Sequence, residues 1–135
     1  MLKSFGETDI EKLKKDAMCS PTLRSRLLLH DNQSDNIQQM LIVLHHSSHV
    51  QMHRHPTQKS ESYYVIAGLM RVYYWDSHRG RFWFEDYSSE DKSKKTYGRH
   101  SEGLWHMPES LTEWCVYLET YDGPFIKEFD VEYID

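Results

Sequence analysis

Short apolar runs separated by turn-forming residues dominate the chain from residue 23 onward. Runs of this length that are rich in aromatic and β-branched residues predict strands. We expect strands at 23–30, 39–46, 62–68, 70–75, 81–87, 112–121 and 124–134. Turn signals fall at 31–36, 68, 76–80, 107–110 and 122–123, and the polar segment 88–103 predicts a mobile loop. Many short strands at this spacing favour an all-β antiparallel sandwich or barrel.

A single helix is predicted, close to the N-terminus. Thr8 and Glu11 have the spacing of a capping box, and apolar residues follow at helical spacing. We expect this helix over 9–17, and the Ser20–Pro21 pair ends it because a residue before proline disfavours helical backbone.

Histidine is unusually frequent, with nine among 135 residues and five of them within 45–55. Histidine is the commonest metal ligand in proteins. His53 and His55 are two residues apart, which on a strand places both imidazoles on one face. A turn after them would bring Glu61 back beside the two rings. Two imidazoles and a carboxylate suit a divalent transition metal such as zinc, iron, manganese or nickel.

This spacing resembles the first signature of the cupin superfamily, in which HxH is followed by a short gap, a glutamate, six residues and a glycine. The glycine is Gly68 here. The GxxH core of the second cupin signature is matched by Gly103 and His106. The resemblance therefore implies four metal ligands: His53, His55, Glu61 and His106.

The second signature is only partly matched. The proline and the asparagine that usually accompany it are Ser101 and Ser110 in this chain. His100 lies in the same segment and is the rival of His106 for the fourth ligand position. A cupin that has kept these residues without binding a metal is the other alternative.

Three separated motifs, in order, resemble the WbuC family of small cupin-fold metalloproteins, which is associated with bacterial O-antigen and surface-polysaccharide gene clusters. The motifs are SPTLRSRLLLH at 20–30, HRHPTQKSES at 53–62, and WH at 105–106 followed by ETYDGPF at 119–125. The chain departs from the family at Met52, where the family has a proline, and in its tail, which lacks the tryptophan- and proline-containing ending.

The resemblance implies a cupin double-stranded β-helix, or jelly-roll barrel, with a metal in its interior. It also implies an enzyme that acts on a sugar or nucleotide-sugar intermediate of bacterial surface-polysaccharide (O-antigen) biosynthesis, as an isomerase, epimerase or lyase. An iron-dependent dioxygenase is the alternative enzyme class, because three histidines and one glutamate also suit iron for oxygen chemistry. A non-catalytic metal- or carbohydrate-binding module is the second class of function.

Three further side chains are candidate catalytic residues that would move a proton beside the metal: Tyr64, Lys59 and Glu119. Tyr64 is three residues beyond Glu61, so on a regular strand it would point to the opposite face. Surface ion pairs are the alternative role for Lys59 and Glu119.

An anionic part of the substrate has its own candidate residues. Arg24 and Arg26 are two apart and share a strand face, so they could form a fork for phosphate or carboxylate. His30 lies close by in the sequence and is assigned to the same pocket, with a structural role as its alternative.

Length and charge restrict the domain organisation and the partners. A chain of 135 residues suits one domain over 1–135, with a helical extension at 1–19 and a β-barrel at 20–135. A net charge of -5 does not favour nucleic-acid binding.

No apolar run reaches the roughly 20 residues that span a bilayer, and the N-terminus lacks a secretory signal, so we expect a cytoplasmic protein without a membrane partner. The expected partners are a sugar-derived small molecule and a second copy in a homodimer.

Overall fold

The computed structural model describes residues 2–134 and is almost entirely β, which confirms the predicted class. Among these residues, ten strands form two five-stranded antiparallel sheets, in the orders β1-β2-β9-β4-β7 and β10-β3-β8-β5-β6. The strands of the first sheet are β1 (Arg24–Leu28), β2 (Ile37–His45), β9 (Trp114–Asp122), β4 (Glu61–Ala67) and β7 (Tyr97–His100). Those of the second sheet are β10 (Glu132–Tyr133), β3 (His53–Arg54), β8 (Trp105–Ser110), β5 (Leu69–Asp76) and β6 (Arg81–Ser88).

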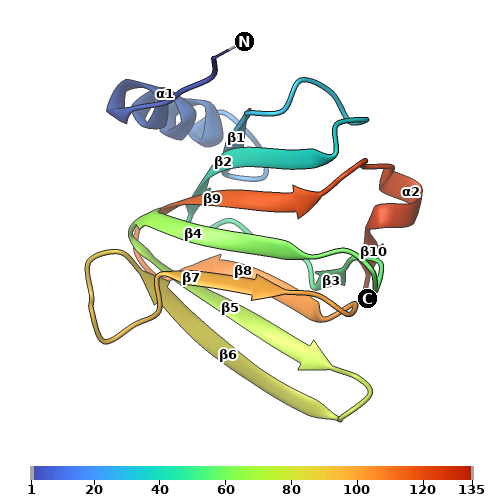
Figure 1. Ribbon diagram of the computed structural model, residues 1–135. Helices are drawn as coiled ribbons and strands as arrows, with labels where there is room; N and C mark the ends of the chain where they lie inside the picture. Colours follow the sequence, from blue (N-terminus) through green and yellow to red (C-terminus); the bar gives the residue numbers. More distant parts are fainter. Residues whose placement is uncertain (1, 135) are drawn as a thin grey trace.

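The two sheets face each other and enclose the main core (Figure 1). Alternate residues of each strand point between the sheets, as the pleat of a strand requires. Leu44, Val65 and Val72 lie there without solvent exposure, together with several tyrosines. Along β4 and β5, buried residues alternate with more exposed ones, and these two strands correspond to apolar runs of the sequence.

Helix α1 (Glu7–Met18) covers the outer face of the first sheet beside β1 and β2 (Figure 1). Its buried side chains Ile10, Leu13 and Ala17 form a second apolar cluster with Leu41, Val43 and Val116. The helix is thus held by the outward-facing apolar residues of β2 and β9, which the first core does not use.

The cap of α1 differs from the prediction. Gly6 is the N-cap, and its backbone N–H donates to the Asp9 carboxylate at 2.8 Å. Thr8 already lies inside the first turn, so the pair Thr8 and Glu11 does not form the predicted capping box.

Two other sequence predictions are wrong at segments near the site. Residues 107–110 were expected to turn, yet they belong to β8. Pro108 is tolerated there because β3 pairs with β8 only at His106, so no second neighbouring strand needs the missing N–H. Within the expected loop 88–103, residues Tyr97–His100 form β7, which pairs with the start of β4.

The C-terminal segment 124–134 was expected to be one strand. It instead forms the short helix α2 (Lys127–Asp130) and then β10. The turn closes because the Asp130 carboxylate accepts hydrogen bonds from the backbone N–H of Ile126, at 2.6 Å, and from side chains of the barrel.

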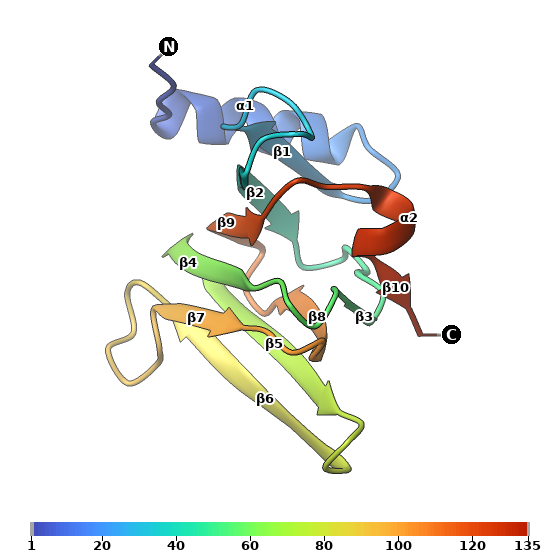
Figure 2. The same cartoon turned by 45° about the vertical axis from the view of Figure 1, so that its right-hand side comes forward.

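One end of the barrel gathers the chemistry-bearing residues. The loops at 55–60, 77–80 and 101–104 lie at this end, which we call the mouth, and α2 and β10 lie beside β3 there (Figure 2). Neither helix among residues 2–134 has the length and apolar character that crossing a membrane requires.

Candidate metal centre

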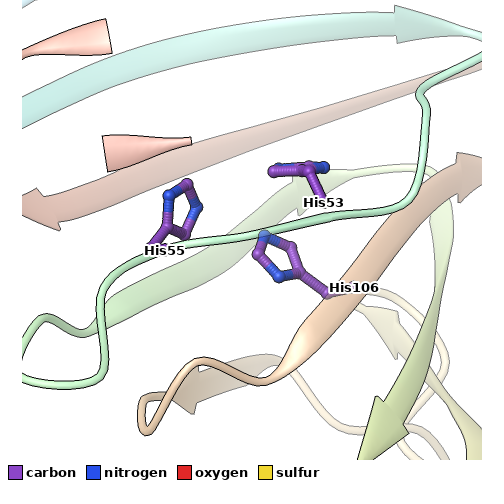
Figure 3. A group of neighbouring side chains, drawn as sticks. All are labelled: His53, His55 and His106. Atoms are coloured by element: carbon purple, nitrogen blue, oxygen red, sulfur yellow. The ribbon is translucent and has the colours of Figure 1, made fainter. Parts of the chain in front are cut away.

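Three histidines meet between β3 and β8 at the mouth. His53 and His106 are cross-strand partners, and His55 follows β3 by one residue. The three rings turn toward one another (Figure 3). Each offers a nitrogen within 4.8 Å of the other two, so a single ion could contact all three.

Two more side chains reach this cluster from the opposite sheet. Glu61 opens β4 and His100 closes β7, and the register of the two strands pairs them directly. One Glu61 carboxylate oxygen lies 3.7 Å from Nε2 of His106 and also contacts Nε2 of His55. Glu61 is 4% exposed, and its carboxylate faces the rings of His55 and His106. The cluster therefore joins the two sheets.

The three histidines share one hydrogen-bond pattern. Nδ1 of His53 contacts the Gln51 carbonyl at 2.8 Å, Nδ1 of His55 the Asp130 carbonyl at 2.7 Å, and Nδ1 of His106 the Leu104 carbonyl at 2.9 Å. A carbonyl oxygen can only accept, so each Nδ1 carries the proton. Nε2 of each ring is then the nitrogen left for the cluster, which is the arrangement that metal-ligating histidines show in proteins.

The inner nitrogens of two of these rings face the Glu61 carboxylate. Nε2 of His55 and Nε2 of His106 are buried and make no well-formed hydrogen bond within residues 2–134, although the Glu61 carboxylate contacts the first and lies 3.7 Å from the second. An unpaired buried polar atom costs roughly 1–3 kcal/mol. Unpaired nitrogens beside a buried carboxylate match what a divalent transition metal takes from a protein, so the residues present fit such an ion.

His100 has a different environment from His106. Its Nε2 lies 2.7 Å from the Tyr63 hydroxyl in the barrel interior. His100 belongs to a second group of potential ligands with Glu61 and His106, whereas His106 belongs to both groups. The sequence had left these two histidines as rivals, and the pattern of free nitrogens favours His106.

Burial and charge set the protonation of the cluster. Burial lowers the pKa of His53 to about 3, so this ring is neutral near pH 7. Burial acts to raise the pKa of Glu61, but His106 and His55 outweigh it and hold the pKa well below the usual range. For His55, burial is outweighed by the Glu61 carboxylate, which raises the pKa. The centre thus offers one ionised carboxylate and at least one neutral imidazole.

The three candidate proton carriers lie in different places. Glu119 faces the barrel interior on β9, diagonal to Glu61, and burial together with the Glu61 charge raises its pKa well above the usual range. Lys59 donates from Nζ to the Asp130 carboxylate at 2.6 Å. Tyr64 is 49% exposed on the outer face of β4, as its spacing from Glu61 predicts, so it does not reach the cluster.

Arg24 and Arg26 share one strand face, as their spacing predicts, and it is the inward face because they pair with Leu44 and Ile42. Arg24 is already engaged, donating to the His49 carbonyl at 3.1 Å. His30 contacts the main chain of Gln39 through Nδ1 and holds the β1–β2 connection, which matches its structural alternative.

Two residues that contact the site were not singled out from the sequence. Asp130 bonds to His55 through its carbonyl, and Tyr63 bonds to His100 through its hydroxyl. Tyr63 is one residue from the candidate Tyr64, and strict alternation from the buried Glu61 would have selected it. Asp130 carries no such signal, since its place depends on the helical turn α2.

A recess of about 620 Å³ opens at the mouth, and its lining does not include His53, His55, Glu61 or His106. Leu104, in the loop before β8, lines this recess, and its backbone carbonyl accepts a hydrogen bond from Nδ1 of His106. Its walls include Thr57, Trp75, His78, Arg79, Trp83, Glu102 and Leu104. The mixture of indole rings, charges and hydroxyls gives a small polar molecule both flat surfaces and hydrogen-bonding groups.

Comparison with known proteins identifies the fold. The family model described as a domain of unknown function (DUF6016) matches residues 5–82. A search of curated proteins found no match.

Solved structures with a similar fold include SO0799 from Shewanella oneidensis, with a TM-score of 0.66, 11% identity, and coverage of 82% of this chain and 73% of that one. The capsular polysaccharide assembling protein CapF from Staphylococcus aureus gives a TM-score of 0.64 at 16% identity, over 82% of this chain and 33% of CapF. An oxalate oxidase in complex with the substrate analogue glycolate gives 0.64 at 10% identity, over 85% of this chain and 57% of that one.

These solved structures share the jelly-roll fold, so the predicted fold is confirmed, and membership of the cupin superfamily stays a prediction. The chain spans about a third of CapF and little more than half of oxalate oxidase, and at these identities the similarity concerns the fold alone. The WbuC resemblance stays a prediction.

Proposed function

We propose that this chain, which belongs to the family described as a domain of unknown function (DUF6016), is a cupin that binds one divalent transition metal at its mouth. The ligands would be Nε2 of His53, His55 and His106 together with the Glu61 carboxylate. The observation that carries the proposal is that Nε2 of His55 and of His106 are buried against the Glu61 carboxylate without a well-formed hydrogen bond, while each Nδ1 is bonded to a carbonyl.

The protonation states support this assignment. A metal competes with protons for each ligand, so neutral rings and an ionised carboxylate bind it best. The lowered pKa values of His53 and Glu61 provide such groups at neutral pH. A bound ion would polarise a carbonyl or lower the pKa of a bound water.

We further propose that the protein is an enzyme on a sugar or nucleotide-sugar intermediate of bacterial surface-polysaccharide biosynthesis, of isomerase, epimerase or lyase type. The WbuC-like motifs support this substrate class, and so does the fold similarity to a protein named for capsular polysaccharide assembly. The recess at the mouth has the size and the aromatic and polar walls that a sugar ring requires.

Glu119 is the residue best suited to move a proton in such a reaction. It faces the barrel interior near Glu61, and burial together with the Glu61 charge raises its pKa well above the usual range, which favours the protonated carboxyl. A carboxylic acid kept neutral by burial can donate a proton to a reacting group. Tyr64 faces away from the cluster and Lys59 is bonded to Asp130, so neither is as well situated.

Metal content tests the first part of the proposal. The purified protein is stripped with a chelator, reloaded with zinc, manganese, iron(II) or nickel, and measured by mass spectrometry of the metals. We expect the unmodified protein and His46→Ala to retain one ion per chain and His53→Ala to lose it, because His46 is exposed at the opposite end of the barrel. Absence of bound metal in the unmodified protein would refute the assignment.

A panel of nucleotide sugars tests the substrate class. We expect at least one of them to raise the melting temperature of the metal-loaded protein and to be converted into a product detectable by chromatography. A sugar that binds and returns unchanged with every metal would instead identify a binding module. Oxygen consumption with a substrate would identify a dioxygenase.

A further inference from the structure

The Asp130 carboxylate is a buried hub at the mouth. It is 3% exposed, and it accepts hydrogen bonds from Nζ of Lys59, the Tyr121 hydroxyl and the backbone N–H of Ile126, each at 2.6 Å. The three donors come from the loop before β4, from β9 and from the start of α2. Together they fix the main chain at residue 130 against the barrel.

The backbone carbonyl of the same residue holds a histidine of the metal cluster. It accepts from Nδ1 of His55 at 2.7 Å. His55 lies just beyond β3, which ends at Arg54, so no ladder hydrogen bond of a named strand holds its backbone. The orientation of this ring therefore depends on the position of the Asp130 carbonyl.

The rest of the C-terminal segment also follows the ligand-bearing strand. Strand β10 lies beside β3 (Figure 2). Tyr133 on β10 is the register partner of His53, and Glu132 bonds to Arg54 at 2.9 Å. The start of the segment from Ile126 to Tyr133 is thus bonded to the Asp130 carboxylate through the backbone N–H of Ile126, and its end is paired with β3 through β10.

From this arrangement we propose that Asp130 is a positioning residue of the metal centre. Its carboxylate is bonded to Lys59, Tyr121 and Ile126, and through them it holds the carbonyl that keeps the proton of His55 on Nδ1 and aims Nε2 at the cluster. The inference rests on the proposed metal site for its effect on affinity, and on the hydrogen-bond geometry alone for its effect on His55. Outer partners of this kind commonly change metal affinity by about 10–100-fold when they are removed.

Three variants remove different hydrogen bonds of the Asp130 carboxylate. Asp130→Ala removes all three side-chain contacts, Tyr121→Phe removes one hydroxyl, and Lys59→Met removes one amine. Asp86→Asn is the matched control, because Asp86 is also a partly buried carboxylate in a two-bond pair, with Arg71, on the outer face of the second sheet. A general loss of an ion pair would affect Asp86→Asn equally.

The test measures two properties of each variant. The first is the Nδ1 proton of His55 in the metal-free protein, observed by ¹⁵N-edited NMR as a slowly exchanging imidazole signal. The second is the dissociation constant for cobalt(II), with the visible absorption spectrum of the bound ion as a report on ligand geometry.

We expect the Nδ1 signal in the unmodified protein and in Asp86→Asn, and its loss or fast exchange in Asp130→Ala. Cobalt affinity should fall about 10–100-fold in Asp130→Ala, with a changed spectrum, and by less in Tyr121→Phe and Lys59→Met. If Asp130→Ala fails to fold, Tyr121→Phe decides the question, supported by Lys59→Met, which also removes a bond to the Pro124 carbonyl. Unchanged Nδ1 signals and cobalt spectra in the variants, or equal effects in Asp86→Asn, would overturn the inference. Failure of the unmodified protein to bind cobalt would instead refute the proposed metal site, and the NMR comparison would still decide the role of Asp130.

Discussion

His53 and His106 are direct cross-strand partners between β3 and β8, and their ring centroids lie 4.2 Å apart. This pairing brings the first and the second cupin-like motif together at one register position, although they are far apart in the sequence. It also gives the proposed centre two candidate ligands on the same side of one sheet, because directly paired residues of adjacent antiparallel strands project to one face. Several consequences of this arrangement can be measured.

Removing His106 should abolish metal binding, while removing His100 should weaken it much less. His106 has a free Nε2 in the cluster, whereas Nε2 of His100 is bonded to Tyr63. By calorimetry, His106→Ala should lose more than about 100-fold in affinity, beyond the range typical of outer partners, and His100→Ala about tenfold or less. The reverse order would make His100 the ligand.

The two buried carboxyl groups of the interior should respond differently to amide substitution. Glu61 is ionised beside the histidines, so Glu61→Gln removes a ligand charge and should eliminate metal binding. Glu119 has a raised pKa, which favours its neutral, protonated form. Glu119→Gln therefore replaces one neutral group with another and should change the dissociation constant for the metal less than about tenfold. Equal losses in the two variants would contradict this division of roles.

The metal-free protein should lose stability as the pH falls from about 6.5. Burial lowers the pKa of His53 and of His100 to about 3, so between these values the unfolded chain binds protons that the folded chain does not. Each ring can contribute up to about 1.4 kcal/mol per pH unit to the slope.

The other two groups titrate outside most of this window. The raised pKa of His55 gives stability that is complete below about pH 6.5 and is lost at higher pH. The lowered pKa of Glu61 gives stability that is lost only as the pH falls below about 4.5. Urea unfolding between pH 4.5 and 6.5 should therefore show a rising free energy, and a flatter curve for the double variant His53→Gln/His100→Gln. An equally steep curve in that variant would refute the assignment.

Gly68 should be required for the turn between β4 and β5. Its φ is +78°, and an added Cβ would lie 2.2 Å from the Trp114 carbonyl oxygen. Gly80 has a similar φ of +61° in the β5–β6 turn, with nothing within 4 Å of an added Cβ. Gly68→Ala should reduce the free energy of unfolding by about 2–4 kcal/mol, and Gly80→Ala by about 1 kcal/mol. Similar losses would show that backbone conformation alone decides the cost.

Local pattern was sufficient to predict much of this structure. The spacing of His53, His55 and Glu61 depends only on strand geometry and one turn, and the structure brings these residues together with His106. The short apolar runs likewise predict most strands, because alternation along a strand is a local property.

Features that depend on long-range contacts were not predictable in this way. Strand β7 lies in a polar segment and pairs with the start of β4, so its sequence has no apolar alternation to reveal it. The pattern of residues 124–134 predicts a strand, yet Asp130 bonds to Lys59 and Tyr121 and the segment forms α2. A contact between residues so distant in the chain is visible only once the barrel is assembled.

The central claim is tested most directly by a crystal structure of the metal-loaded protein, with anomalous scattering recorded at the absorption edge of the metal. The account predicts a single strong peak bounded by Nε2 of His53, His55 and His106 and by the Glu61 carboxylate, with each Nδ1 still bonded to its carbonyl. A crystal grown with excess metal that shows no peak between these residues, or a peak held by other side chains, would contradict it.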